Sequence, residues 1–209
     1  NPGAAMIDQG ALGEFDDRLR ESGFPTLAGV DEAGRGPLAG PVVAAVVVMR
    51  PGVHPQDIVD SKTLSAGRRD AALQRILEGC VEVSLGAAWQ DEIDEINIRA
   101  ATLLAMSRAI LQLTVSPDLV LVDGRDLPPM SCPGVALVKV DARSESVAAA
   151  SIVAKVARDA IMCHLHQVYP EYGFDRHKGY PTKEHLRRLA VLGPCPLHRR
   201  TYRGVDRTG

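Results

Sequence analysis

The segment from Leu27 to Met49 limits most strongly what this chain can fold into. A short apolar run, Leu27–Asp31, ends in an acid and is followed by a turn rich in glycine and proline. The next run, Val42–Met49, is apolar at every position, as in a strand that is buried on both faces. A strand, a Gly/Pro turn and a second strand predict a β-hairpin whose second strand lies inside the fold.

The rest of the chain alternates between strand and helix patterns. The helical segments carry apolar residues at steps of three, four and seven, and capping residues or prolines bound them. We therefore expect an α/β fold with a mixed five-stranded sheet flanked by helices. Further strands are expected at Val81–Leu85, Leu119–Asp123 and Val135–Val140, and helices at Ser65–Leu77, Asp91–Leu113, Ser144–Val168 (capped by Ser144 or Ser146) and Thr182–Leu192.

The composition is ordinary for a globular protein. Of 209 residues, 45% are hydrophobic and 24% are charged, so the chain is long enough to bury a sizeable core. No apolar run is as long as a membrane span and no signal peptide opens the chain, which predicts a soluble, cytoplasmic protein. The four cysteines are far apart in sequence, which favours reduced thiols over a disulfide framework.

Charge is divided unevenly along the chain, although the net charge is only -2. Between Arg176 and Gly209 there are 9 Lys and Arg residues against 2 Asp and Glu residues, and the remainder of the chain is acidic. Carboxylates that hold metal in one place and cations that hold phosphate in another would suit a nuclease. A basic tail that is simply solvated is the alternative.

Acidic residues follow three of the apolar runs. Val30 leads into Asp31 and Glu32, Val122 into Asp123, and Val140 into Asp141. If these strand ends converge, the carboxylates repel one another unless a divalent cation lies between them, and oxygen ligands suit Mg²⁺ or Mn²⁺. Each acid can instead be a cap or turn residue, and Asp141 is the most open to this alternative because it precedes a helix.

Glycine-rich and basic motifs suggest contacts with phosphate. Gly34, Arg35 and Gly36 fit the beginning of a dinucleotide fingerprint, but a proline and a strand follow where that fingerprint requires a helix. The glycines suit instead a turn whose backbone N–H groups approach a ligand closely. Lys62 in a loop, and Lys178 beside Tyr180, are candidate contacts to phosphate and to a sugar or base. The histidines show no zinc spacing and are interpreted as structural.

Taken together, these motifs resemble bacterial type 2 ribonuclease H, also called ribonuclease HII. The resemblance runs from about Phe15 to Tyr202, and the order of its motifs is specific. Two departures from the family pattern are Val140, where glycine is frequent, and Thr63 in the second motif. The motifs are AGVDEAGRGPLAGPVVAAVVV at 28–48, DSKTLS at 60–65, INIRAAT at 96–102, LVDG at 121–124, AAASIVAKVARD at 148–159, HKGYPT at 177–182 and HRRTY at 198–202.

The resemblance implies a ribonuclease H-like fold with a C-terminal helical extension. It implies residues 15–170 as the catalytic domain and 171–209 as a basic extension that contributes to substrate binding, after a tail at 1–14 whose first five residues read as a remnant ahead of Met6. The implied catalytic and metal-binding acids are Asp31, Glu32, Asp123 and Asp141, holding two Mg²⁺ or Mn²⁺ ions. The implied substrate-binding residues are Gly34, Arg35 and Gly36 for the ribose 2′-OH, Tyr180 for the RNA–DNA junction, and Lys62, Ser144 and Lys178 for phosphate.

The implied activity is endonucleolytic cleavage of the RNA strand of RNA/DNA hybrids and of DNA at single embedded ribonucleotides. The products would carry 5′-phosphate and 3′-hydroxyl ends, and the family default is a monomer. Two alternatives stay open. A metal-dependent exonuclease of related fold would use the same acids but need a free end, and a non-catalytic hybrid-binding module would bind without cleaving.

Overall fold

The fold was analysed in a computed structural model, which describes residues 9–55, 58 and 66–205. Five strands and six helices alternate along this part of the chain, with two short 3₁₀ turns. The strands are β1 (Leu27–Ala33), β2 (Val42–Met49), β3 (Cys80–Ala88), β4 (Leu119–Asp123) and β5 (Gly134–Leu137). The helices are α1 (Gln9–Glu21), α2 (Ala66–Gly79), α3 (Gln90–Leu111), α4 (Glu145–Val168), α5 (Phe174–His177) and α6 (Lys183–Leu192), and the turns are η1 (Val140–Ala142) and η2 (Pro170–Tyr172).

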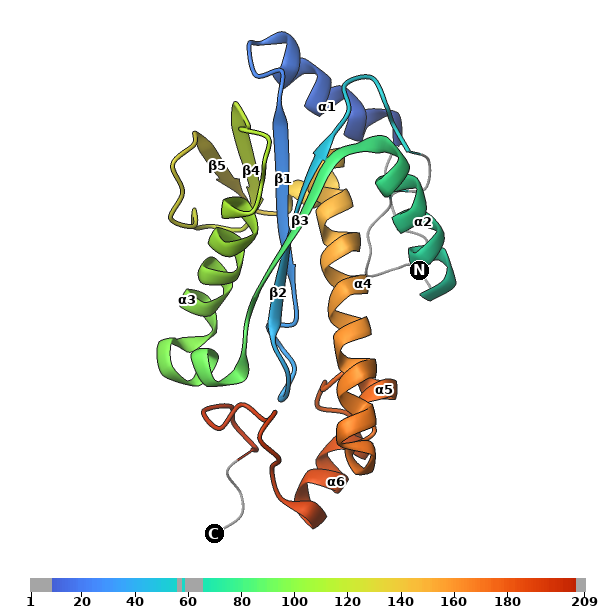
Figure 1. The fold of residues 1–209 in the computed structure, drawn as a ribbon, viewed down its shortest axis with the longest axis vertical. Coiled ribbons are helices and arrows are strands. Elements are labelled where there is room, and N and C mark those ends of the chain that lie inside the picture. The colour runs from blue at the N-terminus through green and yellow to red at the C-terminus, as the bar shows by residue number, and fades with distance from the viewer. Residues whose placement is uncertain (1–8, 56–57, 59–65, 206–209) are drawn as a thin grey trace, which may run out of the picture.

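The strands form one mixed sheet in the order β3-β2-β1-β4-β5 (Figure 1). Strand β1 pairs with β2, and β2 with β3, in antiparallel fashion, which confirms the predicted hairpin. The pairs β1–β4 and β4–β5 are parallel. The expected mixed five-stranded sheet is therefore confirmed, and β1 lies at its centre, where the antiparallel and parallel halves meet.

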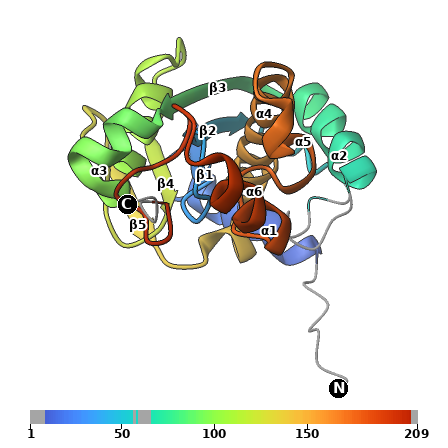
Figure 2. The same ribbon diagram turned by 90° about the horizontal axis from the view of Figure 1, so that it is seen from below.

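Helices cover both faces of the sheet, with α3 on one side of the strands and α4 with α2 on the other (Figures 1 and 2). Side chains of β2 alternate between the two faces of the sheet. Ala44, Val46 and Val48 pack toward α3. Ala45 and Val47 pack toward α2 and α4 instead. Every residue of β2 is therefore buried, as the unbroken apolar run predicts.

Two boundaries differ from the sequence-based expectation. The predicted strand over Val135–Val140 is too long, because β5 ends at Leu137 and Lys139 has a left-handed backbone with φ of 60°. The expected tail at 1–14 is also too long, because α1 begins at Gln9. Helix α1 is held to the start of α4 by Asp16, whose Oδ2 accepts hydrogen bonds from Ser146 N and Oγ at 2.9 and 2.6 Å.

Helix α3 is kinked at Asn97, where the backbone turns to φ of 67°. The Asn97 side chain accepts hydrogen bonds from the N–H groups of Arg99 and Ala100 at 3.0 and 3.2 Å, so it caps the second half of the helix. The kink brings Arg99 to Asp126, with two contacts of 2.9 and 2.6 Å. One predicted helix is thus two helical segments joined at a polar residue.

The C-terminal extension folds against the end of α4 and then returns to α3 (Figure 1). Thr182 caps α6, accepting a hydrogen bond from His185 N at 3.2 Å. The segment after α6 is fixed to α3 because Asp94 accepts from Arg200 N and Thr201 N at 2.7 and 3.0 Å. Over the described residues, no helix is long and apolar enough to cross a membrane.

Candidate active site

Two acids of the site come from adjacent parallel strands. The β1–β4 register pairs Val30 with Val122, so Asp31 and Asp123 follow at the same edge of the sheet. Side chains alternate between the faces of a strand. Leu27 of β1 and Leu121 of β4 pack together on the α4 side. Asp31 and Asp123 share that face by alternation, and both therefore point toward α4.

The third acid, Asp141, comes from η1, immediately before α4. It is not at a strand end as expected, since the left-handed turn at Lys139 separates it from β5. The Val140 N–H donates to Asp123 Oδ1 at 3.0 Å, which fixes η1 against the end of β4. One oxygen from each of Asp31, Asp123 and Asp141 lies within 4.8 Å of the other two, in the arrangement needed to share a metal ion.

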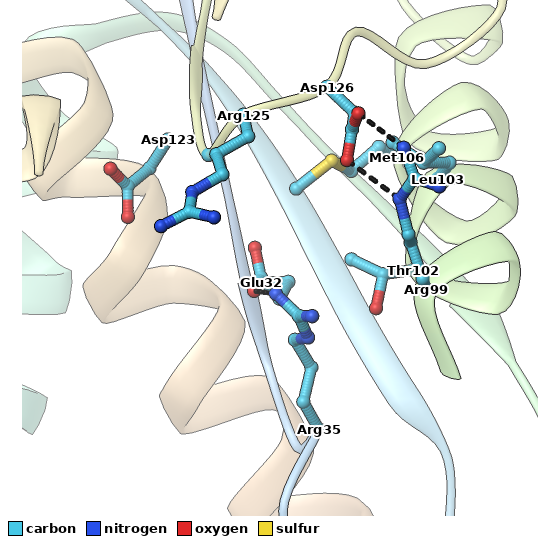
Figure 3. A pocket seen from close by; sticks show the side chains of 10 residues that line it. Glu32, Arg35, Arg99, Thr102, Leu103, Met106, Asp123, Arg125 and Asp126 are labelled. Carbon is cyan, nitrogen blue, oxygen red and sulfur yellow. Dashed lines mark hydrogen bonds and ion pairs between the residues drawn. The ribbon is translucent and has the colours of Figure 1, made fainter. Parts of the chain in front are cut away.

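The fourth predicted acid, Glu32, lies next to Asp31 and Asp123, whose carboxylates affect its pKa. It pairs with Arg35 at 3.3 Å and also lines a side pocket with Arg99 and Arg125. Figure 3 shows this pocket, with the guanidinium of Arg125 between the carboxylates of Asp123 and Glu32 in that view. Glu32 is thus brought beside the cluster without joining the three acids that converge.

Burial and like charges make the ionised form of Asp31 unfavourable. Its residue is only 5% exposed. Burial, followed by the nearby Glu32 and Asp123 carboxylates, raises the pKa of Asp31 well above its ordinary value. The Glu32 N–H donates to Asp31 Oδ1 at 2.7 Å, and a hydrogen bond from Ser151 also lowers the pKa of Asp31. Converging oxygen donors with uncompensated charge fit a divalent cation.

A cleft beside the acids collects most of the predicted substrate-binding residues. Tyr180 lies in it with its ring 5.5 Å from Lys155 Nζ and 5.8 Å from the Arg158 guanidinium. Both distances are within the range of cation–π attraction, which orients the ring. The cleft is lined by Asp31, Glu32, Ala33, Gly34, Arg35, Gly36, Asp123, Ser151, Lys155 and Tyr180.

Two of the predicted phosphate contacts do not face this cleft. Ser144 is fully buried and caps α4, accepting from Val147 N at 3.3 Å, so its hydroxyl cannot reach a phosphate and that prediction is wrong. The Lys178 ammonium donates to Asp175 O and contacts Cys163 Sγ at 3.1 Å, so it is turned away from the acids. Lys62 lies outside the described residues.

A histidine cluster holds the segment that carries Tyr180. The Gly179 N–H donates to His177 Nδ1 at 3.1 Å, so the proton of His177 is on Nε2. His185 Nδ1 lies 2.9 Å from Tyr180 O, a carbonyl that only accepts, so His185 carries its proton on Nδ1. The two rings therefore hold the backbone at both Gly179 and Tyr180.

His198 completes the cluster. The Cys195 N–H donates to His198 Nδ1 at 3.0 Å, so the proton of His198 is on Nε2, and it is donated to His185 Nε2 at 3.0 Å. These bonds assign one proton to each ring. The interpretation of these histidines as structural agrees with their positions.

We expect the cluster to stay uncharged in acid. Burial lowers the pKa of His185 and of His198 to about 4. Two-bond ¹H–¹⁵N NMR spectra at pH 5.5 should show neutral rings, protonated on Nδ1 in His185 and on Nε2 in His198. Both folded-state pKa values lie below the unfolded value, so the unfolded state takes up protons first as the pH falls. The free energy of unfolding is therefore unaffected by these rings above about pH 6.5 and decreases as the pH drops toward 4. A charged ring at pH 5.5 would contradict the assignment.

Sequence reasoning missed several residues that line the site. Ser151 and Lys155 are one helical turn apart on α4 and both face the cleft. Their i, i+4 spacing next to buried alanines was the available signal. Arg99 and Arg125, in the side pocket, carried no local signal, since α3 and the loop after β4 meet only in the folded chain.

The mixed sheet and the three converging carboxylates define an α/β protein with a candidate site for a divalent metal ion. A family model described as Ribonuclease HII matches residues 28–205. The chain is 48% identical to a ribonuclease HII of Geotalea daltonii, covering 92% of this chain and 89% of the relative. It is 53% identical to that of Nitrosococcus oceani, covering 87% and 90%. The chain therefore belongs to the ribonuclease HII family, as its motifs predicted, and is a metal-dependent ribonuclease.

Solved structures support the same assignment. The ribonuclease H2 of Pyrococcus horikoshii OT3 superposes with a TM-score of 0.72 at 30% identity, covering 86% of this chain and 95% of that one. The RNase HII of a PCNA:RNase HII complex from Archaeoglobus fulgidus gives a TM-score of 0.71 at 27% identity, covering 85% and 95%. The ribonuclease H-like fold is therefore confirmed.

Proposed function

We propose that this chain is an endonuclease that hydrolyses the RNA strand of RNA/DNA hybrids and cuts on the 5′ side of single ribonucleotides embedded in duplex DNA. The products are 5′-phosphate and 3′-hydroxyl ends. The observation that carries the proposal is one cleft lined by Asp31, Asp123, the Gly34–Gly36 turn and Tyr180, with Asp141 converging on the two acids. This arrangement supports the proposal, because candidate metal ligands lie next to groups suited to contact a ribose.

Asp31, Asp123 and Asp141, with Glu32 beside them, would hold two Mg²⁺ or Mn²⁺ ions. When bound, such ions supply an activated water and stabilise the departing 3′ oxygen. The chain's own part is to hold the carboxylates in place. Asp31 is oriented by the Glu32 N–H and Ser151, and Asp123 by the Val140 N–H, so the ligands are set before substrate arrives.

The Gly34–Gly36 turn and the Tyr180 ring are proposed to recognise the substrate. The 2′-OH is the group that distinguishes RNA from DNA, and backbone N–H groups of Gly34, Arg35 and Gly36 are suited to contact it. The Tyr180 ring, held beside two cations, would stack at the RNA–DNA junction. Tyr180 belongs to the basic extension, so this segment contributes to substrate binding, and Lys62 is kept as a phosphate contact.

Removing the Tyr180 ring should lower preference for the junction more than general affinity. We expect Tyr180→Ala to cut a duplex with one ribonucleotide about tenfold less well, relative to a long hybrid, than the unmodified protein, because one stacking contact is lost. Tyr180→Phe keeps the ring and should keep the ratio. The measurement is kcat/KM on both substrates, and an unchanged ratio in Tyr180→Ala would remove the proposed role.

A related exonuclease would use the same acids, so the need for a free end must be tested. A covalently closed DNA circle with one ribonucleotide in one strand has no end. The proposal expects it to be nicked at the ribonucleotide. An intact circle, together with shortening of the linear form, would establish the exonuclease instead, and binding of both forms without cleavage would establish a hybrid-binding module.

The chain is proposed to act as a monomer in the cytoplasm. Cys80, Cys132, Cys163 and Cys195 are free thiols, which suits a reducing compartment. Sedimentation at working concentration should give the mass of one chain, and a stable dimer would contradict the monomer.

A further inference from the structure

Two buried arginines lie directly behind the Gly34–Gly36 turn. Arg158 of α4 and Arg199 of the C-terminal segment are both fully buried. Across residues 9–55, 58 and 66–205, neither guanidinium forms an ion pair with a carboxylate. Burial lowers the pKa of Arg158 to about 10 and also lowers that of Arg199, so Arg158 stays charged at neutral pH despite its burial. Such groups require compensation from other polar atoms.

Backbone carbonyls provide this compensation. Arg199 donates to Gly34 O at 2.6 Å, to Arg35 O at 3.0 Å and to Gly40 O at 2.8 and 3.0 Å. Arg158 donates to the carbonyls of Pro41, Lys178 and Ala39 at 2.9, 3.0 and 3.1 Å. The two side chains therefore hold the carbonyls of a single turn and of the Lys178 segment that faces it.

Turning these carbonyls inward fixes where the amides point. In a planar trans peptide, the C=O and the following N–H point in opposite directions. With the carbonyls of Gly34 and Arg35 directed at Arg199, the N–H groups of Arg35 and Gly36 are directed away from it. In the described part of the chain these two N–H groups have no backbone acceptor. Both residues line the cleft, which leaves the two donors for a ligand.

Tyr202 and a glycine support the same arrangement. Tyr202 Oη donates to Arg35 O at 2.7 Å and accepts from Arg199 at 3.1 Å, so it fixes both the carbonyl and the guanidinium. Gly34 has φ of +99°, and a Cβ there would lie 2.0 Å from Arg158 Nε. Glycine at 34 is therefore required by the arginine beneath it as well as by the turn.

We propose that Arg158 and Arg199 are positioning residues for recognition of the ribose 2′-OH: they hold the carbonyls of the turn inward so that the amides of Arg35 and Gly36 face the substrate. This inference rests on the proposed function. Arg158 and Arg199 would thus contribute to the preference for a ribonucleotide without contacting the substrate themselves.

The test is the ratio of two affinities measured in buffer without divalent metal. One duplex contains a single ribonucleotide and the other is all DNA. We expect Arg199→Lys to lower this ratio about tenfold, because the compact lysine ammonium lacks the planar fork of donors with which the guanidinium makes four bonds to the carbonyls of Gly34, Arg35 and Gly40. Tyr202→Phe, which removes one hydrogen bond to Arg35 O, should lower it about threefold. A fold defect alone lowers both affinities together and leaves the ratio unchanged.

Arg200→Lys is the matched control, since Arg200 is the exposed neighbour and any phosphate contact it makes affects both duplexes equally. Unchanged ratios in folded Arg199→Lys and Tyr202→Phe would overturn the inference. If Arg199→Lys does not fold, Tyr202→Phe decides alone. A ratio of one in the unmodified protein would instead overturn the proposed reading of the 2′-OH, and with it the basis of this inference.

Discussion

Replacing Asp31 by asparagine is expected to abolish cleavage while leaving the fold intact. Asn keeps the acceptor for the Glu32 N–H but removes the charge that a divalent ion requires. Loss of this carboxylate should cost about 4 kcal/mol of transition-state stabilisation, or about a thousandfold in kcat/KM. In EDTA the variant should melt at a higher temperature, because burial and neighbouring acids raise the pKa of Asp31 and make its charge unfavourable at pH 7.

Asp118→Asn is the control for this experiment. Asp118 is exposed just before β4, at the opposite end of the strand from Asp123, and accepts from Thr26 N at 2.9 Å. Its activity should stay within about twofold of the unmodified protein. Asp123→Asn should behave like Asp31→Asn. Full activity in either site variant would contradict the assignment of these acids as metal ligands.

Gly29→Ala is expected to have the largest effect on stability. A Cβ at position 29 would lie 2.2 Å from the backbone carbon of Ser146 and 2.3 Å from Val147 N, so β1 and α4 could not keep their present separation. Strand β1 carries Asp31, and α4 begins shortly after Asp141. We expect a loss of about 3 kcal/mol or more in the free energy of unfolding, because neither backbone can move without disturbing the core.

Chemical denaturation measures this change, with Gly67→Ala as the matched control. Gly67 is an exposed residue of α2 with open space around its position. Alanine there should raise the free energy of unfolding by about 0.4–1 kcal/mol, since Gly67 has no positive φ and alanine reduces the conformational entropy of the unfolded chain. Equal stability of Gly29→Ala and the unmodified protein would mean that the close approach of β1 and α4 is not maintained in solution.

The parts of the site that were predictable from sequence are those set by short-range patterns. Asp31 and Asp123 each end a run of strand residues, and parallel pairing of β1 with β4 brings them together. Val42–Met49 was predictable as a buried strand because no polar residue interrupts it. In both cases, neighbours in the sequence decide the structure.

The remainder depended on contacts between distant segments. Ser144 was expected to bind phosphate from the family resemblance, but in the folded chain it is fully buried and caps α4, beside the contact between α1 and α4. Arg199 belongs to a basic segment that patterning assigns to solvent, yet it is fully buried against carbonyls about 160 residues away in the chain. The neighbouring sequence cannot show which basic side chain is buried, because the carbonyls that accept its hydrogen bonds belong to the turn after β1.

The most direct measurement is cleavage of a DNA duplex containing one ribonucleotide, with Mg²⁺, Mn²⁺ or EDTA, beside an all-DNA control. We predict one cut on the 5′ side of the ribonucleotide with either metal, none with EDTA, and none in the control. Cutting of the all-DNA duplex would contradict recognition of the 2′-OH. Cutting that persists in EDTA would contradict the metal-dependent role of Asp31, Asp123 and Asp141.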